Sequence, residues 1–129
     1  MSADDSTHKE RRAFIRISKS LKLYYKVIQE TITSSKNRHA PEVFSSTRDV
    51  GAGGLLFLTN ERLMFGSVLE VRLMLPSAEK LEPIVCSAEV LRCNIFESPS
   101  LYETAICFLD ISNHDRLILS EFVVAHAQL

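Results

Sequence analysis

The sequence predicts an all-β fold with one helix: a small six-stranded antiparallel β-barrel followed by a C-terminal α-helix. Three observations support this prediction. About six segments have the length and composition of strands, residues 69–75 alternate with a period of two, and only the run from 113 to 127 is typical of a helix. Closing the sheet into a barrel removes exposed strand edges, which favours this architecture for a chain of 129 residues.

The clearest strand signal lies at residues 69–75, where Leu or Val occupies every second position until Pro76 ends the strand. Residues 21–27 alternate in a similar way, with apolar side chains on one face. The other predicted strands are residues 42–50, 54–59, 84–96 and 101–109. Turn residues separate these strands, and Glu97–Ser100 is the predicted turn before the last one.

The predicted helix follows the last strand. Ser112 or Asn113 is a suitable N-cap, and Asp115 suits the positive end of the helix dipole. The run that follows contains no proline or glycine, and its apolar residues form a stripe that requires burial. The members of this stripe are Leu117, Ile118, Phe122, Val123 and Ala125.

The composition, with 46% hydrophobic and 24% charged residues, is typical of one globular domain. We expect residues 1–9 to form a flexible lead-in and residues 10–129 to form the domain. Within it, an arm covers residues 10–16, the barrel about 21–109 and the helix about 113–127. No apolar run approaches the roughly twenty residues of a membrane span, and no secretory signal is evident, so we expect a cytoplasmic protein.

The cysteines and histidines predict no metal site. Cys86, Cys93 and Cys107 lie in strand-like segments without metal-ligand spacing, so we expect buried, reduced thiols. The four histidines fall in separate segments.

Arginines gather just before the first strand. Arg11, Arg12 and Arg16 place three guanidinium groups within six residues, and a guanidinium matches both phosphate oxygens and the O6/N7 edge of guanine. The cluster therefore suggests a phosphorylated purine, although a solvated basic tail has the same appearance. Its conformation, helical or extended, stays open.

A second motif begins at Asp49, where Gly51, Gly53 and Gly54 precede a strand. Three glycines in four residues indicate a turn that needs positive φ angles or the close approach of another group. The Asp49 carboxylate could accept the N1–H and N2–H of a guanine. Taken alone, the motif is also typical of an ordinary hairpin turn.

Together, R-R-x-x-x-R followed by D-x-G-x-x-G-L-L-F resembles the PilZ domain, the bacterial receptor module for cyclic di-GMP, over nearly the whole chain. The resemblance implies that the first motif is an arm that folds over the ligand. Arg12, Arg16, Asp49 and Gly54 match the family pattern, whereas Gly51 replaces its usual small hydroxyl residue. Losing one neutral hydrogen bond costs about 0.5–1.5 kcal/mol, so this departure should weaken binding without abolishing it.

The resemblance implies a non-catalytic second-messenger receptor that relays its signal to a separate effector protein. The implied ligand-binding residues are Arg11, Arg12, Arg16, Asp49, Gly51, Gly53 and Gly54. Arginine at position 11 further implies that the ligand can enter as an intercalated dimer. No cofactor or metal ion is expected. The alternative is a degenerate PilZ-type adaptor that binds a protein partner without cyclic di-GMP.

Other functions fit the sequence less well. It lacks both G-x-S-x-G and the lysine of a phosphate-binding P-loop, so we expect no catalysis. Tyr24, Tyr25 and Phe57 could stack on single-stranded bases. However, the net charge is −1, and the basic residues concentrate between positions 8 and 26, which leaves the rest of the chain acidic. We therefore expect a compact anion rather than nucleic acid.

Overall fold

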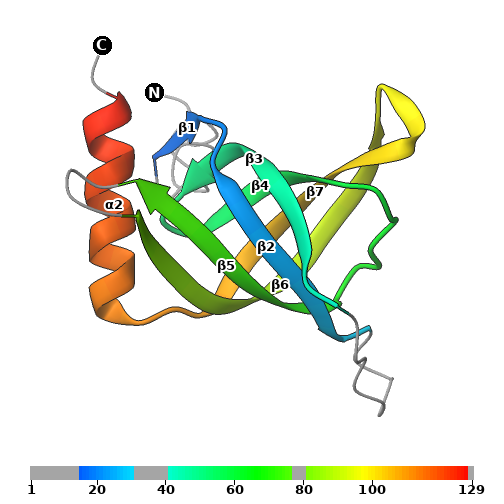
Figure 1. Ribbon diagram of the computed structural model, residues 1–129, viewed down its shortest axis with the longest axis horizontal. Helices are drawn as coiled ribbons and strands as arrows, with labels where there is room; N and C mark the ends of the chain where they lie inside the picture. Colours follow the sequence, from blue (N-terminus) through cyan, green and yellow to red (C-terminus); the bar gives the residue numbers. More distant parts are fainter. Residues whose placement is uncertain (1–14, 31–40, 77–80, 128–129) are drawn as a thin grey trace, which may run out of the picture.

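The computed structural model describes residues 15–30, 41–76 and 81–127. Seven strands precede one helix in this part of the chain. They are β1 (Arg16–Ser18), β2 (Lys22–Gln29), β3 (Val43–Gly51), β4 (Gly54–Thr59), β5 (Val68–Pro76), β6 (Leu81–Phe96) and β7 (Ser98–Asp110), followed by α2 (Asn113–Ala127). Figure 1 shows the strands wrapped around one another, with α2 at one end of the sheet.

The strands form one antiparallel sheet that closes in a ring. The order of neighbours is β3, β2, β5, β6, β7 and β4, and β4 pairs again with β3. Six strands therefore complete the ring, which confirms the predicted antiparallel, barrel-like architecture with a C-terminal helix. The additional strand β1 pairs with the last residues of β3. It lies at the end of the arginine arm, whose conformation the sequence left open.

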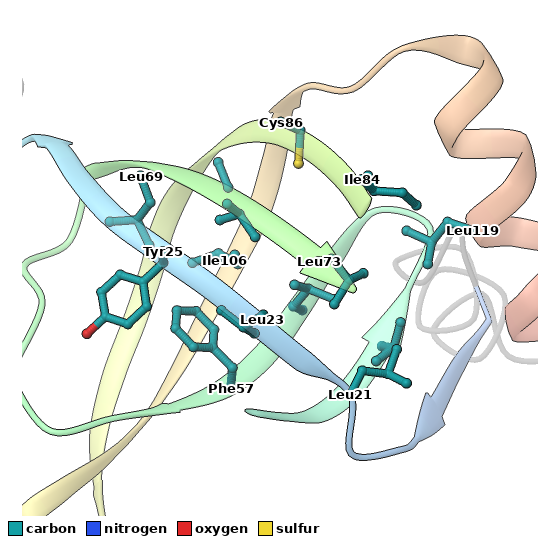
Figure 2. Close-up of a cluster of buried hydrophobic side chains, with 14 of the residues drawn as sticks. Leu21, Leu23, Tyr25, Phe57, Leu69, Leu73, Ile84, Cys86, Ile106 and Leu119 are labelled. Atoms are coloured by element: carbon teal, nitrogen blue, oxygen red, sulfur yellow. The ribbon is translucent and has the colours of Figure 1, made fainter. Parts of the chain in front are cut away.

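Alternating side chains from the ring strands form the core. Leu69, Val71, Leu73 and Leu75 of β5 are buried, as the period of two predicts. Figure 2 shows residues from β2, β4, β5, β6 and β7 meeting inside the ring, together with Leu119 from α2. The buried side of α2 consists of Leu119 and Val123, which cover the end of the core next to β1 and β3.

The start of α2 follows from its cap. The Ser112 hydroxyl accepts a hydrogen bond from the Asp115 backbone N–H at 3.0 Å, and the Ser112 carbonyl accepts one from the Arg116 N–H at 2.9 Å. Ser112 is thus the N-cap, the first of the two candidates that the sequence offered. None of the helices in the described residues is long and apolar enough to cross a membrane.

The hairpin between β6 and β7 corrects one expectation. The predicted turn Glu97–Ser100 contracts to Glu97, which adopts a positive φ of 62°, and Ser98 already pairs with Phe96. A single left-handed residue closes the hairpin, so β7 begins three residues earlier than the serines and proline predicted. The long hairpin extends past the ring, because β6 stops pairing with β5 at Glu89.

The cysteines correct another expectation. All three are free thiols, but only Cys86 is buried, whereas Cys93 and Cys107 are half-buried. The physical reason at Cys93 is its place in the part of β6 that has left the ring and has β7 as its only described neighbour. A strand-like sequence therefore did not guarantee burial.

Candidate functional site

The end of the arginine arm and the aspartate motif are adjacent strands. In the antiparallel pair of β1 and β3, Arg16 lies opposite Gly51 and Ser18 lies opposite Asp49. Between them, Ile17 and Val50 form a cross-strand pair that faces the core, with exposed fractions of 9% and 0%. Because successive side chains in a strand point to opposite faces, Arg16, Ser18, Asp49 and Gly51 share the outward face. We call these four residues the β1–β3 face.

Asp49 is oriented by a hydroxyl on this face. Ser18 Oγ donates a hydrogen bond to Asp49 Oδ1 at 3.0 Å. Arg16 is the diagonal neighbour of Asp49 on the ladder, and standard geometry places such residues about 7–8 Å apart. The β1–β3 face therefore presents a hydroxyl, a carboxylate and a guanidinium side by side.

Arg16 forms no ion pair with any residue that the structure describes. It is also exposed. Arg48, the other arginine of β1 and β3, is engaged elsewhere: its Nε lies 2.7 Å from Glu103, and its guanidinium lies over the Phe96 ring. Among the described arginines of β1 and β3, Arg16 is therefore the one whose guanidinium can bind an anion.

Gly51 allows β1 to lie close to β3. A Cβ atom at Gly51 would lie 3.0 Å from Cγ of Arg16 and 3.1 Å from the carbonyl oxygen of Ile15. Positive φ is not the reason for glycine here, because Gly66 is the glycine with a positive φ. Of the two explanations that the sequence allowed, close approach applies.

Gly53 and Gly54 hold the turn against β7. The Gly53 carbonyl accepts a hydrogen bond from the Phe108 N–H at 3.0 Å. A Cβ atom at Gly54 would overlap the carbonyl oxygen of Ile106. The group that approaches Gly54 is therefore the β7 backbone, which the sequence motif alone could not reveal.

Thr47 fixes the corner between β1 and β2. Its side chain is 2% exposed, and its hydroxyl donates to the Lys19 carbonyl at 2.6 Å and accepts from the Leu21 N–H at 2.8 Å. The Lys19 N–H in turn donates to the Arg48 carbonyl. These hydrogen bonds satisfy the backbone groups between β1 and β2 and hold this corner against β3. They therefore help to fix the position of β1 and of Arg16.

The structure brings together Arg16, Asp49 and Gly51, and it adds residues that sequence reasoning missed. Ser18 was missed because residues 16–18 had no strand assignment; an extended strand would have placed it on the face of Arg16. Arg116 was missed because it is distant in sequence, yet its Nη1 donates to the Ala52 carbonyl at 3.2 Å. The predicted ligand residues Arg11 and Arg12 lie outside the described residues.

The residues considered for other functions are placed differently. Tyr25 and Phe57 are 1% and 0% exposed and pack edge to face in the core, so neither side chain can stack on a base. Tyr24 is half-buried beside Phe44 and Arg72. Within the described segments, no three His, Cys, Asp or Glu side chains gather as a metal ion would require.

Solved structures share this fold at low sequence identity. The inhibitor of motility MotI/DgrA from Bacillus subtilis aligns with a TM-score of 0.75 and 18% identity, over 91% of this chain and 51% of that one. The PilZ domain of YcgR from Escherichia coli with c-di-GMP aligns with a TM-score of 0.60 and 14% identity, over 89% of this chain and 90% of that one. PlzA from Borreliella burgdorferi in complex with c-di-GMP aligns with a TM-score of 0.56 and 12% identity, over 96% of this chain and 55% of that one. This chain thus spans about half the length of MotI/DgrA and PlzA.

Sequence comparison identifies the family directly. No curated protein sequence matches this chain. The family model of the PilZ domain, however, matches residues 10–125, which include the arginine arm, the aspartate motif and nearly all of α2. The chain therefore belongs to the PilZ domain family.

Proposed function

We propose that this protein is a non-catalytic receptor for cyclic di-GMP. The observation that carries the proposal is the β1–β3 face, where the side chains of Arg16, Ser18 and Asp49 lie on one outward surface and the buried Gly51 lies opposite Arg16. Two of the structures with the same fold, the YcgR PilZ domain and PlzA, are complexes with c-di-GMP. Family membership and the chemistry of the face thus support the same ligand.

Each group on the face has a role that fits a cyclic dinucleotide. The Arg16 guanidinium binds a phosphate or the O6/N7 edge of guanine, because it offers a rigid fork of donors. An ionised carboxylate only accepts hydrogen bonds, so Asp49 accepts the N1–H and N2–H of a guanine. Arg11 and Arg12 supply further guanidinium groups from the arm.

Ser18 offsets the departure at Gly51. The PilZ family pattern usually has a small hydroxyl residue at the position of Gly51, and Ser18 supplies a hydroxyl on the same face from the neighbouring strand. It already donates to Asp49. A neutral hydrogen bond is worth about 0.5–1.5 kcal/mol, so this hydroxyl would recover much of the affinity that Gly51 lacks.

Gly51, Gly53 and Gly54 contribute through shape. Gly51 leaves room for Arg16, whereas Gly53 and Gly54 hold the turn to β7. Ligand binding would then close the arm over the β1–β3 face. A ligand changes output only through a difference in affinity between two states, so the open and closed forms must present different surfaces to an effector protein.

Titration calorimetry with cyclic di-GMP, and with GTP and the linear dinucleotide as controls, tests the proposal. Selective binding supports the receptor. About two ligands per chain would favour an intercalated dimer and a role for Arg11, whereas one ligand would exclude the dimer. No binding, confirmed by a second assay at high ligand concentration, would overturn the receptor in favour of a PilZ-type adaptor.

A further inference from the structure

The turn between β3 and β4 is attached to the helix as well as to the sheet. Arg116 lies in the first turn of α2, and its Nη1 donates to the Ala52 carbonyl across 64 residues of sequence. Ala52 is only 4% exposed, and a buried carbonyl needs a partner. A hydrogen bond from a charged donor is roughly twice as strong as a neutral one. Arg116 therefore holds the middle of the turn that begins at Gly51.

Three elements hold this turn, and they differ in freedom to move. On one side, Gly51 pairs with Arg16 of β1, and Arg16 belongs to the proposed ligand site. On the other, the Gly53 carbonyl bonds to Phe108 of β7, a strand fixed within the closed ring. The third attachment, from Arg116, leads to a helix outside the ring. A movement of the turn would therefore pass to α2 rather than to β7.

None of the residues in the first turn of α2 is buried. Leu119 and Val123 anchor the helix in the core, but both lie beyond the first turn. Before Leu119, the side-chain hydrogen bonds that hold the helix include the Ser112 cap and the contact of Arg116 with Ala52. Segments with few buried apolar contacts open locally at low free energy. Figure 1 shows this helix beside β1 and the end of β3, and both strands contact it.

We propose that Arg116 is a positioning residue that couples the β1–β3 face to the first turn of α2, so that ligand binding orders this turn and α2 carries the signal to the effector. The proposal rests on the proposed binding of cyclic di-GMP. In this proposal Arg116 acts through its hydrogen bond to the Ala52 carbonyl. It sets the geometry of the turn before binding, and such preorganisation raises affinity.

Hydrogen exchange of the full chain, with and without cyclic di-GMP, tests the coupling. The variants are Arg116→Gln, which removes the charge, and Arg116→Lys, which keeps a charged donor. Arg92→Gln is the matched control, because Arg92 is exposed and lies in the part of β6 that pairs with β7 and no longer pairs with β5. Figure 1 shows the β6–β7 hairpin on the opposite side of the molecule from α2. Melting temperatures verify that each variant folds.

In the wild type and Arg92→Gln, we expect ligand to slow amide exchange at residues 113–118 about threefold or more. Arg116→Gln should lose this ligand-dependent protection and bind about three- to tenfold more weakly, while Arg116→Lys should recover part of both. A purely structural role would speed exchange along the whole helix without removing the response to ligand.

The outcomes separate the two proposals. If the wild type binds cyclic di-GMP but exchange at residues 113–118 does not respond, or responds equally in Arg116→Gln, the coupling is wrong and the receptor stands. If the wild type does not bind cyclic di-GMP at all, the proposed function fails and the coupling fails with it.

Discussion

A side chain at Gly51 would compete with Arg16 for space. An added Cβ atom would lie 3.0 Å from Arg16 Cγ and 3.1 Å from the Ile15 carbonyl oxygen, whereas ordinary carbon contacts are about 3.5–4.0 Å. Either β1 moves or Arg16 leaves its preferred rotamer, which costs about 0.5–1.5 kcal/mol. We therefore expect Gly51→Ala to bind cyclic di-GMP roughly two- to tenfold more weakly.

A serine at position 51 separates the steric effect of a side chain from the effect of an added hydrogen bond. Gly51→Ser introduces the same Cβ atom and adds a hydroxyl, whose hydrogen bond is worth about 0.5–1.5 kcal/mol. Because the two effects have similar size and opposite sign, we expect Gly51→Ser to bind within about threefold of the wild type and more tightly than Gly51→Ala. The sequence alone predicts that Gly51→Ser holds or improves affinity if the backbone angles at this position tolerate a side chain.

A double-mutant cycle with Arg16→Ala identifies the cause. Arg16→Ala removes Cγ but leaves the Ile15 carbonyl oxygen in place, so Gly51→Ala should cost less in that background than in the wild type, with a coupling energy of about 0.5 kcal/mol or more. The assay is calorimetry at one salt concentration, with melting temperatures to verify folding. An equal cost of Gly51→Ala in both backgrounds, or wild-type affinity of Gly51→Ala, would refute the steric argument.

Three further predictions concern the site and the core. Arg16→Ala should weaken cyclic di-GMP binding by at least about 1.5–3 kcal/mol, the range for a hydrogen bond to a charged group, with an unchanged melting temperature; an unchanged dissociation constant would remove Arg16 from the site. Gly54→Ala should destabilise the fold by about 1–3 kcal/mol or more, because its Cβ would overlap the Ile106 carbonyl; a melting temperature equal to the wild type would show that β4 and β7 can separate. Burial, and then Asp115 and Asp110, raise the pKa of the Cys86 thiol to about 12. The native state thus keeps a proton that the unfolded state releases, and its stability should fall as pH rises above about 9, by up to about 1.4 kcal/mol per pH unit. Urea unfolding at pH 8 and pH 10 should show a larger fall for the wild type than for Cys86→Ala, and equal falls would contradict the burial argument.

Long periodic segments made most of the fold predictable. The period of two in β5 predicted both the strand and its buried face, and Ser112 marked the start of α2. In contrast, β1 has three residues, of which only Ile17 is buried, so it is too short to produce a pattern. The hairpin was mispredicted because Glu97 alone makes the turn that serine and proline signals spread over four residues.

The sequence offered candidate residues for the site but not their geometry. The sequence identified Arg16 and Asp49, yet only the register of β1 against β3 places them on one face. The same register adds Ser18. The partner of Gly54 could not be predicted either, because it is the backbone of β7, more than fifty residues later in the chain. Contacts between distant segments depend on strand pairing, which local patterns do not determine.

Backbone NMR with cyclic di-GMP, and with GTP as the control, would locate the ligand on the protein. We expect saturable shifts with cyclic di-GMP that are largest at the amides of residues 16–18 and 49–54 and smallest in the β6–β7 hairpin at residues 91–101. Shifts that concentrate on the hairpin, or shifts of equal size with GTP, would contradict the claim that the β1–β3 face is a selective site for cyclic di-GMP.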